Sequence, residues 1–490
     1  MNQKPNILLI MSDQHSRKVT GAYGNSLVRT PNLDRLAAEG TRFSGVCCAA
    51  PVCVPSRMSF MTGRIPSRNR VWNNHGVLSS GIPTWSHALG AAGYETALIG
   101  RMHFLGPDQR HGFMHRPIAE GSARHPGAAE QGGPRYTRLP GATAGQQRHS
   151  FEYAGRGHSF YQYYDTDVTK TACHFLEERT GQEKPFAAVV GFLLPHCPFI
   201  GPKEAFDYYY DRIETTVELG SEPKCIEALR EWRNLHPEAT EHQLRVARAA
   251  YYAMIECMDR NVGRIVDTLE RTEQAENTLV IYCSDHGEML GEHGLWSKKC
   301  FYEDAVGVPL IARLPGLTQP GTDVTDPCSL VDLAPTFYEL ANAPATDVDG
   351  ESLVPVFEGH ENRERTIVSE VADVNFGTFQ WVGKMVRQGP WKLWQHITAE
   401  GDEWEPVLFN LNEDPDEKNN LAAEPAHNSR RKSMMGHLER DWEPMGISRE
   451  VRGQLQDMQV LKAWARKVEP EHPDTYVWPG PETEEDLELL

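Results

Sequence analysis

Short apolar runs that end in polar residues recur along the chain and predict the buried strands of one sheet. Four mostly apolar runs have the length of strands that are covered on both faces. They occupy residues 7–11, 95–99, 186–193 and 278–283. Apolar positions at helical spacing predict helices over residues 30–40, 84–92 and 240–270. Strands that alternate with helices predict an α/β fold with a large, mostly parallel, doubly wound sheet flanked by helices.

A different pattern begins in the last quarter of the chain. Residues 384–387 and 391–394 flank Gln388-Gly389-Pro390, which is a turn sequence, and together they predict a β-hairpin. A chain of 490 residues is also too long for one ordinary core. We therefore expect an α/β catalytic domain over residues 1–364. A smaller C-terminal α+β subdomain, with an antiparallel sheet and an acidic tail, is expected over 365–490.

The periodic pattern is lost between residues 101 and 160. This segment is rich in glycine, proline, arginine and histidine, and its eight arginines and four acidic residues give it a local net charge of +4. Long loops without periodicity inside a compact domain are usually functional or disordered. We interpret 101–160 as an insertion that forms a lid over the substrate, with a merely solvated insertion as the alternative.

Charge and composition exclude several classes of partner. The formal net charge of −19 argues against nucleic acid or an anionic membrane as a bulk partner. No apolar stretch reaches membrane-spanning length, and the N-terminus lacks the features of a secretion signal, so a cytoplasmic location is expected. Ten scattered cysteines show no zinc or disulfide spacing and indicate reduced thiols. The sequence leaves open whether the chain forms a homo-oligomer.

The segment Cys53–Arg64 combines a helix N-terminus with a nucleophile and a cation. Pro55 suits the first turn of a helix, and Gly63 suits a left-handed exit. Cys53 therefore lies where free amides and the helix dipole favour a negative group. Arg57 follows four residues later, on the same helical face. The segment predicts an anion site with a nucleophile in its floor.

The whole string Cys-Val-Pro-Ser-Arg-Met-Ser-Phe-Met-Thr-Gly-Arg resembles the sulfatase signature, within the alkaline phosphatase superfamily. The resemblance covers roughly residues 5–425, and residues 102–113 are most similar to the branch of choline-sulfatases and phosphonate monoester hydrolases. It implies that a formylglycine-generating enzyme oxidises Cys53 to formylglycine. The hydrated aldehyde would then be the nucleophile, and its second hydroxyl would let sulfate leave by C–O cleavage.

The same resemblance implies a divalent metal site at the ends of two predicted strands. The matching positions are Asp13, Gln14, Cys53, Asp285 and His286. Carboxylate and amide oxygens are hard ligands and favour Ca²⁺. The imidazole of His286 is softer, and Mn²⁺ accepts such mixed ligand sets more readily, so Mn²⁺ is an alternative. Mg²⁺ is a further possible ion.

Catalytic roles follow from the resemblance at matching positions. Arg57 would hold the aldehyde hydrate, and Asp285 would accept its proton. His103 would act as the base that breaks down the hemiacetal. His196 and Lys298 would bind the sulfate and assist the leaving oxygen.

Two further positions, Asn74 and Arg101, are predicted to bind substrate. Arg101 stands where many sulfatases have lysine, and a planar guanidinium binds oxyanions differently from a point charge. Ser12-Asp13-Gln14 also replaces the common paired aspartates, which removes one negative charge from the metal site.

The sequence therefore predicts a sulfatase that hydrolyses a sulfate monoester of a small molecule or a saccharide. One alternative is a phosphonate monoester or phosphodiester hydrolase on the same scaffold, and another is a silent binding protein with an unmodified Cys53. The alcohol part of the ester is left open. A quaternary ammonium group would need an aromatic cage, for which the candidates are Trp72, Phe104, Tyr136 and Tyr153.

Overall fold

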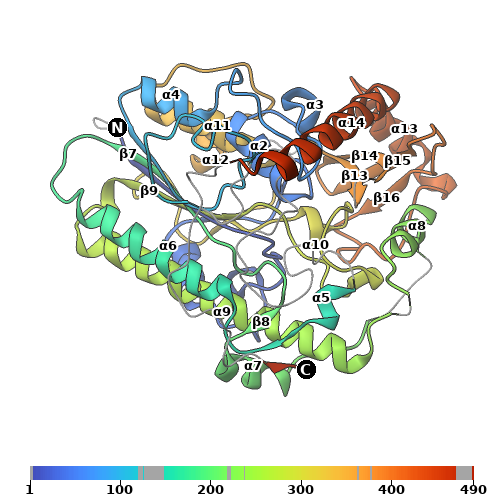
Figure 1. Cartoon of the computed structure of the whole chain (residues 1–490), viewed down its shortest axis with the longest axis horizontal. Coiled ribbons are helices and arrows are strands. Elements are labelled where there is room, and N and C mark those ends of the chain that lie inside the picture. The colour runs from blue at the N-terminus through green and yellow to red at the C-terminus, as the bar shows by residue number, and fades with distance from the viewer. Residues whose placement is uncertain are drawn as a thin grey trace.

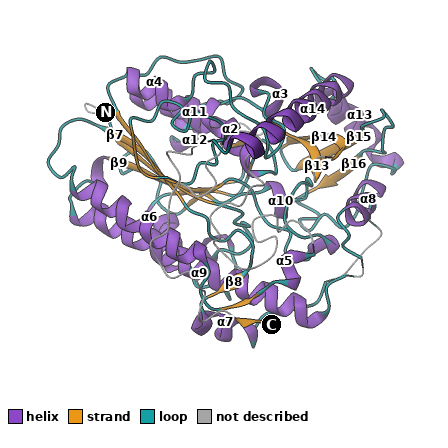
Figure 2. Ribbon diagram, in the orientation of Figure 1, coloured by secondary structure: helices purple, strands orange, loops and turns teal. Residues whose placement is uncertain are grey.

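An eight-stranded sheet runs through the α/β part of the chain in the computed structural model (Figures 1 and 2). The structure describes residues 4–119, 125, 148–217, 222–236, 238–360, 364–375, 378–470 and 488–490. Across the sheet the strands are β11 (Thr322–Val324), β2 (Thr41–Phe43), β10 (Leu310–Arg313), β9 (Thr278–Ser284), β1 (Asn6–Ser12), β7 (Phe186–Gly191), β4 (Glu95–Gly100) and β5 (His115–Ile118). Only β10 runs antiparallel to its neighbours among these strands, so the sheet is mostly parallel.

Helices cover both faces of this sheet, which explains why its central strands are apolar throughout. The long helices α6 (Phe160–Glu177) and α9 (Glu241–Arg271) lie along one face, and α4 (Trp85–Ala91) and α11 (Leu333–Ala341) lie on the other (Figure 1). Every residue of β7 and β9 is buried. The four predicted strands and the predicted fold class are confirmed.

Sequence signals also identify where helices begin. Thr240 and Gln243 form the predicted capping box of α9, in which the Thr240 hydroxyl accepts from the Gln243 amide at 3.2 Å. Helix α1 (Pro31–Glu39) starts at its proline and stops before Gly40. Helix α2 (Cys53–Thr62) ends at Gly63, whose φ of 67° is the predicted left-handed exit.

A second, antiparallel sheet lies beside the large one, at the right of Figure 1. Its strands are β13 (Thr366–Asn375), β14 (Thr378–Gln388), β15 (Trp391–Thr398) and β16 (Val407–Asn410). Gln388 pairs with Trp391 across the predicted hairpin turn. Helices α13 (Asn428–Leu438) and α14 (Pro444–Val468) pack on this sheet. The boundary at 364/365 stays a prediction.

Shorter elements complete the described part. They are β3 (Val46–Cys47), α3 (Pro66–Asn69), α5 (His149–Glu152), β6 (Gly155–Arg156), β8 (Ile200–Gly201), α7 (Lys203–Tyr210), α8 (Lys224–Trp232), α10 (Glu303–Val306), β12 (Cys328–Ser329), α12 (Val354–Phe357) and β17 (Glu488–Leu489). Strand β17 pairs with β6, and Arg156 forms an ion pair with Glu488. The end of the predicted acidic tail is thus bound to the α/β part.

The predicted lid falls largely outside the described residues. Of the segment 101–160, residues 120–124 and 126–147 are not described. Its described ends are more regular than expected, because residues 115–118 form an edge strand of the large sheet and residues 149–152 form a helical turn. The role of the segment as a lid stays a prediction.

Two expectations from composition concern cysteines and membranes. All ten cysteines lie in described residues, and all are free thiols. No helix within the described ranges combines the length and the apolar character that a bilayer crossing requires.

A buried cluster of charges joins the antiparallel sheet to helix α10 of the α/β part. Lys392 of β15 lies between Glu303 of α10 and Glu417, with Nζ–Oε1 distances of 2.9 and 2.8 Å. Arg17 and Arg387 also bind Glu303, at 2.8 and 3.3 Å. Burial alone would raise the pKa of Glu303, but Lys392, Arg387 and Arg17 hold the pKa well below its usual range. The antiparallel sheet therefore supplies charges that the α/β part needs.

Replacing Lys392 with methionine should lower the free energy of unfolding by about 3–5 kcal/mol, because two buried carboxylates would lose their shared cation. Urea denaturation followed by circular dichroism would measure this loss. Lys170→Met is the matched control, since Lys170 forms a surface pair with Asp167 and its side chain is 62% exposed. The control should cost less than about 1 kcal/mol. Equal losses of unfolding free energy in Lys392→Met and Lys170→Met would show that the buried cluster contributes no more to stability than a surface ion pair.

Candidate active site

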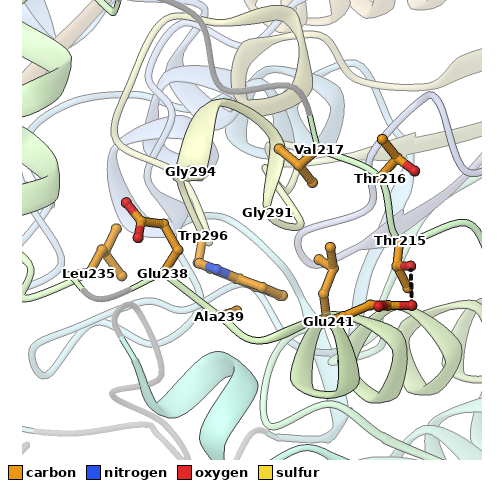
Figure 3. Close-up of a pocket in the computed structure, with 11 residues that line it drawn as sticks. Thr215, Thr216, Val217, Leu235, Glu238, Ala239, Glu241, Gly291, Gly294 and Trp296 are labelled. Carbon is orange, nitrogen blue, oxygen red and sulfur yellow. Dashed lines mark hydrogen bonds between the residues drawn. The ribbon is translucent and has the colours of Figure 1, made fainter.

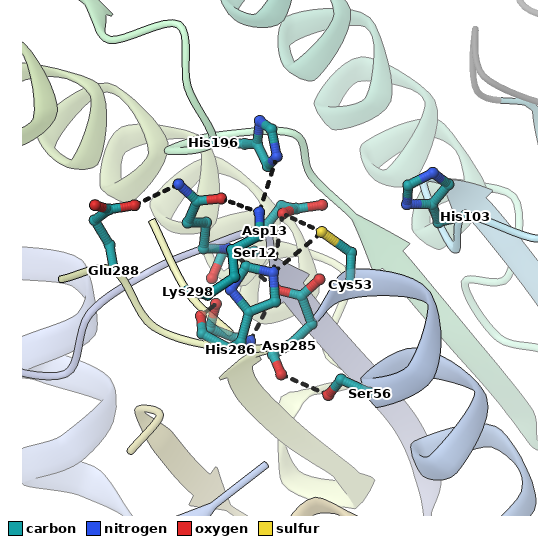
Figure 4. A network of polar contacts seen from close by, with 12 residues as sticks. Ser12, Asp13, Cys53, Ser56, His103, His196, Asp285, His286, Glu288 and Lys298 are labelled. Atoms are coloured by element: carbon teal, nitrogen blue, oxygen red, sulfur yellow. Dashed lines mark hydrogen bonds and ion pairs between the residues drawn. The ribbon is translucent and has the colours of Figure 1, made fainter. Parts of the chain in front are cut away.

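Polar residues from two neighbouring strands meet at the carboxyl edge of the large sheet (Figure 4). Strands β1 and β9 are paired in parallel up to Ser12 and Ser284, so the residues that follow them lie side by side. These are Asp13 and Gln14 after β1, and Asp285 and His286 after β9. All four are fully buried. The sheet thus concentrates them at one point, where open α/β sheets bind ligands.

Cys53 reaches the same point from the first residue of α2. Its Sγ lies 3.1 Å from His286 Nε2 and 3.6 Å from Asp13 Oδ1. The ligand atoms of Asp13, Cys53, Asp285 and His286 all lie within 4.8 Å of one another. Such spacing allows one cation of ordinary bond length to touch all four groups.

The ring of His286 is prepared to be a ligand. Its Nδ1 lies 2.9 Å from the Gly287 carbonyl, which can only accept, so Nδ1 carries the proton. The lone pair of Nε2 therefore faces Cys53 and the two carboxylates. Burial lowers the pKa of His286, which keeps the ring neutral. The donor set of two carboxylates, one imidazole and the side chain at position 53 fits a divalent cation.

Arg57 lies beneath this cluster and binds both carboxylates. Its Nε donates to Asp285 Oδ2 at 2.8 Å, and its Nη2 donates to Asp13 Oδ2 at 3.1 Å. Its Nη1 also donates to the backbone carbonyl of Arg101 at 3.1 Å, and its Nη2 to that of Ser12 at 3.4 Å. The structure thus gives Arg57 a positioning role beside its predicted contact with the hydrate.

Arg101 links the metal cluster to His103. Its Nε donates to Asp13 Oδ2 at 2.7 Å, and its Nη2 lies 2.9 Å from His103 Nδ1. Burial alone would raise the pKa of Asp13, but Arg101 and Arg57 hold the pKa well below its usual range. Burial and the charge of Arg101 lower the pKa of His103.

The contact with Arg101 also sets the tautomer of His103. Because a guanidinium only donates, Nδ1 accepts, and the neutral ring carries its proton on Nε2. In this state Nε2 can donate a hydrogen bond. The predicted role as a base, which needs a proton acceptor, stays a prediction.

His196 and Lys298 form a pair on the other side of the cluster (Figure 4). His196 donates through Nδ1 to the Cys197 carbonyl at 2.6 Å, and its Nε2 accepts from Lys298 Nζ at 3.2 Å. Burial would lower the pKa of Lys298, but the electrostatic influence of its neighbours, led by Cys53 and Asp13, raises the pKa instead. Lys298 is therefore an ammonium ion facing the cluster.

Asn74 lies at the start of α2. Its Oδ1 accepts from the Val54 amide at 3.0 Å, which satisfies one of the free N–H groups of the helix. Among the eleven residues predicted from the sequence, Asn74 and His103 alone are partly exposed. Hydrogen bonds and short contacts connect all eleven residues into one site, and Asn74 is connected to it through Val54. We expect the substrate to enter on the side of Asn74 and His103, because these two side chains are partly exposed.

Sequence reasoning missed Glu288, which is buried beside Gln14. Its Oε2 accepts from Gln14 Nε2 at 2.5 Å, and its Oε1 accepts from the backbone amides of Leu290 and Ser297 at 2.9 and 2.6 Å. The available signal was the position of Glu288 in the sequence. This charged residue lies two positions after His286 and directly before the apolar pair Met289-Leu290, which is consistent with a buried carboxylate near the site.

A separate cavity of about 460 Å³ lies between the start of α9 and the segment that leads to Lys298 (Figure 3). Trp296 lies between Glu238 and Leu235 on one side and the threonines 215 and 216 on the other. None of the predicted catalytic residues lines this cavity. It is therefore distinct from the cluster around Cys53.

Comparisons with known proteins agree on one family. Residues 5–343 match the family described as Sulfatase, and residues 291–443 match N-sulphoglucosamine sulphohydrolase, C-terminal. The choline-sulfatase of Rhizobium meliloti is 36% identical over 443 residues, which cover 86% of this chain and 83% of that protein. The N-acetylglucosamine-6-O-sulfatase of Bacteroides thetaiotaomicron is 28% identical over 507 residues, which cover 89% and 86%. The phosphonate monoester hydrolase of Agrobacterium radiobacter shares the fold, with a TM-score of 0.71 at 23% identity, covering 92% of this chain and 96% of that one.

Proposed function

Since this chain belongs to the sulfatase family, we propose that it hydrolyses a sulfate monoester by means of a nucleophile derived from Cys53 and a divalent cation. The observation that carries the proposal is the meeting of Cys53 with Asp13, Asp285 and His286 at the sheet edge. A cysteine with a purely structural role is usually packed among apolar side chains, whereas Cys53 lies among two carboxylates and an imidazole.

The metal would be held by the residues that surround Cys53. Asp13, Gln14, Asp285 and His286 would bind a divalent cation, which supplies charge for a sulfate oxygen and lowers the pKa of a bound hydroxyl. Ca²⁺ and Mn²⁺ are the main candidates, with Mg²⁺ as a further one. Arg57 keeps the two carboxylates apart from solvent and fixed in direction.

Conversion of Cys53 to formylglycine would replace the thiol by a hydrated aldehyde with two hydroxyls. Lys298 supplies a buried positive charge opposite to it, suited to a sulfate oxygen. His196 accepts from Lys298 through Nε2, and the two together would bind the sulfate and assist the leaving oxygen. Arg101 and His103 would bind the sulfate from the other side, the first by charge and the second through Nε2.

Of the aromatic residues considered for a cation cage, Trp72 and Phe104 are already used in the core. Trp72 packs among residues of the antiparallel sheet, and Phe104 lies 4.5 Å from the ring of His111. Tyr153 is stacked on His149, and Tyr136 lies outside the described residues. These contacts favour no particular alcohol, so the substrate is proposed as a small-molecule or saccharide sulfate.

A panel of esters tests the proposal. Protein produced together with a formylglycine-generating enzyme should hydrolyse at least one of choline sulfate, an aryl sulfate and N-acetylglucosamine 6-sulfate. It should do so faster than a phenyl phosphonate monoester or a phosphodiester of matched leaving group. Mass spectrometry of the peptide that contains Cys53 should show the aldehyde. An intact thiol and no turnover, despite the modifying enzyme, would instead indicate a silent binding protein.

A further inference from the structure

The side-chain amide of Gln14 lies between an acceptor and a donor, which together favour one orientation of the amide. Its Nε2 donates to Glu288 Oε2, and its Oε1 accepts from Lys298 Nζ. We infer that Glu288 is a positioning residue that turns the oxygen of Gln14, and not its nitrogen, toward the metal position. This inference rests on the metal site of the proposed function.

The hydrogen-bond partners fix this orientation without further assumption. Lys298 has three N–H donors and no acceptor, so it can face only the oxygen of the amide. Both oxygens of Glu288 accept, because Oε1 receives two backbone amides and Oε2 receives Gln14. An amide that is turned over would place its N–H groups against Lys298 and its oxygen against a carboxylate. Glu288 lies at the edge of the network, away from Cys53 (Figure 4), and its nearest contact with the predicted metal ligands is the one with Gln14.

The backbone of Gln14 leaves the amide little other freedom. Gln14 has a φ of 69°, in the left-handed region that non-glycine residues rarely adopt. Its N–H donates to Asp285 Oδ1 at 3.0 Å, and its carbonyl accepts from the Tyr251 hydroxyl at 2.6 Å. The main chain is thus held from both sides, and rotation of the amide is the remaining way to present nitrogen to a cation.

Glu288→Gln is therefore a small change with a specific consequence. The glutamine keeps one oxygen, which the amides of Leu290 and Ser297 would claim, so its NH₂ group would face Gln14. Two NH₂ groups cannot hydrogen-bond to each other, so the NH₂ group of Gln14 loses its acceptor and Lys298 alone is left to hold the amide in its orientation. Loss of a group that orients a ligand typically weakens metal binding by about 10- to 100-fold.

The exchanged pair Gln14→Glu with Glu288→Gln should restore binding. Here the carboxylate at position 14 would accept from the NH₂ group at 288 with one oxygen and direct the other toward Lys298 and the metal. Mn²⁺ binding, measured by the EPR signal of free Mn²⁺, and Ca²⁺ binding, measured by calorimetry, provide readouts that do not depend on turnover. We expect the single variant Glu288→Gln to bind about 10- to 100-fold more weakly, and the double variant to return to within a few-fold of wild type.

Glu292→Gln is the matched control, since Glu292 lies on the same segment but pairs with Arg248 at 2.5 Å. It should bind metal as wild type does, and thermal unfolding should show that all variants are folded. Wild-type affinity in Glu288→Gln, or a double variant no better than Glu288→Gln, would overturn the inference. The inference would also be overturned if the single variant Gln14→Glu bound the metal more tightly than the double variant. The added negative charge, and not the orientation of the side chain, would then explain the recovery of metal binding. Failure of every ester in the panel, with these metal affinities as expected, would reject only the proposed reaction.

Discussion

Replacing Cys53 with alanine is expected to lower kcat for the best sulfate ester by about 10⁴-fold or more, because the variant has no precursor of the nucleophile. The variant should remain folded, since Cys53 is the first residue of α2 and Val54 keeps its hydrogen bond to Asn74. Steady-state hydrolysis and thermal unfolding, measured on the same preparation, would check both statements.

Cys328→Ala provides the control for removing a buried thiol. Cys328 is 2% exposed, lies in β12, and takes no part in the cluster around Cys53. It should keep its kcat. Cys53→Ser offers a further comparison, because serine keeps one hydroxyl but lacks the second one that would release sulfate, so it should turn over no more than once. Appreciable steady turnover by Cys53→Ala would end the assignment of the nucleophile.

Removal of divalent metal should abolish activity, with a loss of at least about 100-fold that Ca²⁺ or Mn²⁺ reverses. The physical reason lies in the charges at the sheet edge. Without a cation, Asp13 and Asp285 present negative charge to an incoming sulfate anion, and Arg57 is already engaged with both. Chelation, gel filtration and stepwise return of each ion, followed by assay of kcat/KM, would measure this effect.

Two carboxylates of equal burial separate a metal effect from a folding effect. Asp285→Asn should lose metal affinity and activity together. Asp259→Asn should keep both, because Asp259 is buried but accepts from the amides of Asn32 and Leu33 at the start of α1. Full hydrolysis by rigorously metal-free wild-type protein would contradict the metal assignment.

Local patterns in the sequence were sufficient to predict the strands and the residues at their ends. Strands β1 and β9 each hold a central apolar run, and each strand is followed at once by two strongly polar residues. Parallel pairing then brings Asp13 beside Asp285. The signature at Cys53 supplied the chemistry, because spacing alone does not distinguish a nucleophile from a buried structural thiol.

What the sequence could not predict depends on contacts between distant residues. Lys392 and Glu303 are 89 residues apart, and no local pattern indicates that they share a buried cluster. Glu288 was passed over because its partner, Gln14, lies 274 residues away. Helix α6 is a different case, because its start does carry a local signal. Ser159 and Gln162 form a capping box, but the irregular segment before Ser159 obscured this pattern in the sequence.

The separation along the chain between Cys53 and its neighbours in the site has a consequence for biosynthesis. Cys53 is 1% exposed in the folded protein, and His286, which contacts it, lies 233 residues later. At about 5–20 residues per second, a ribosome needs roughly 12–47 s to synthesise that stretch. During this interval β9 does not yet exist, so the thiol is still open to an enzyme that would modify it. The proposed conversion of Cys53 would therefore be easiest before β9 has been synthesised and His286 has taken its place beside the thiol.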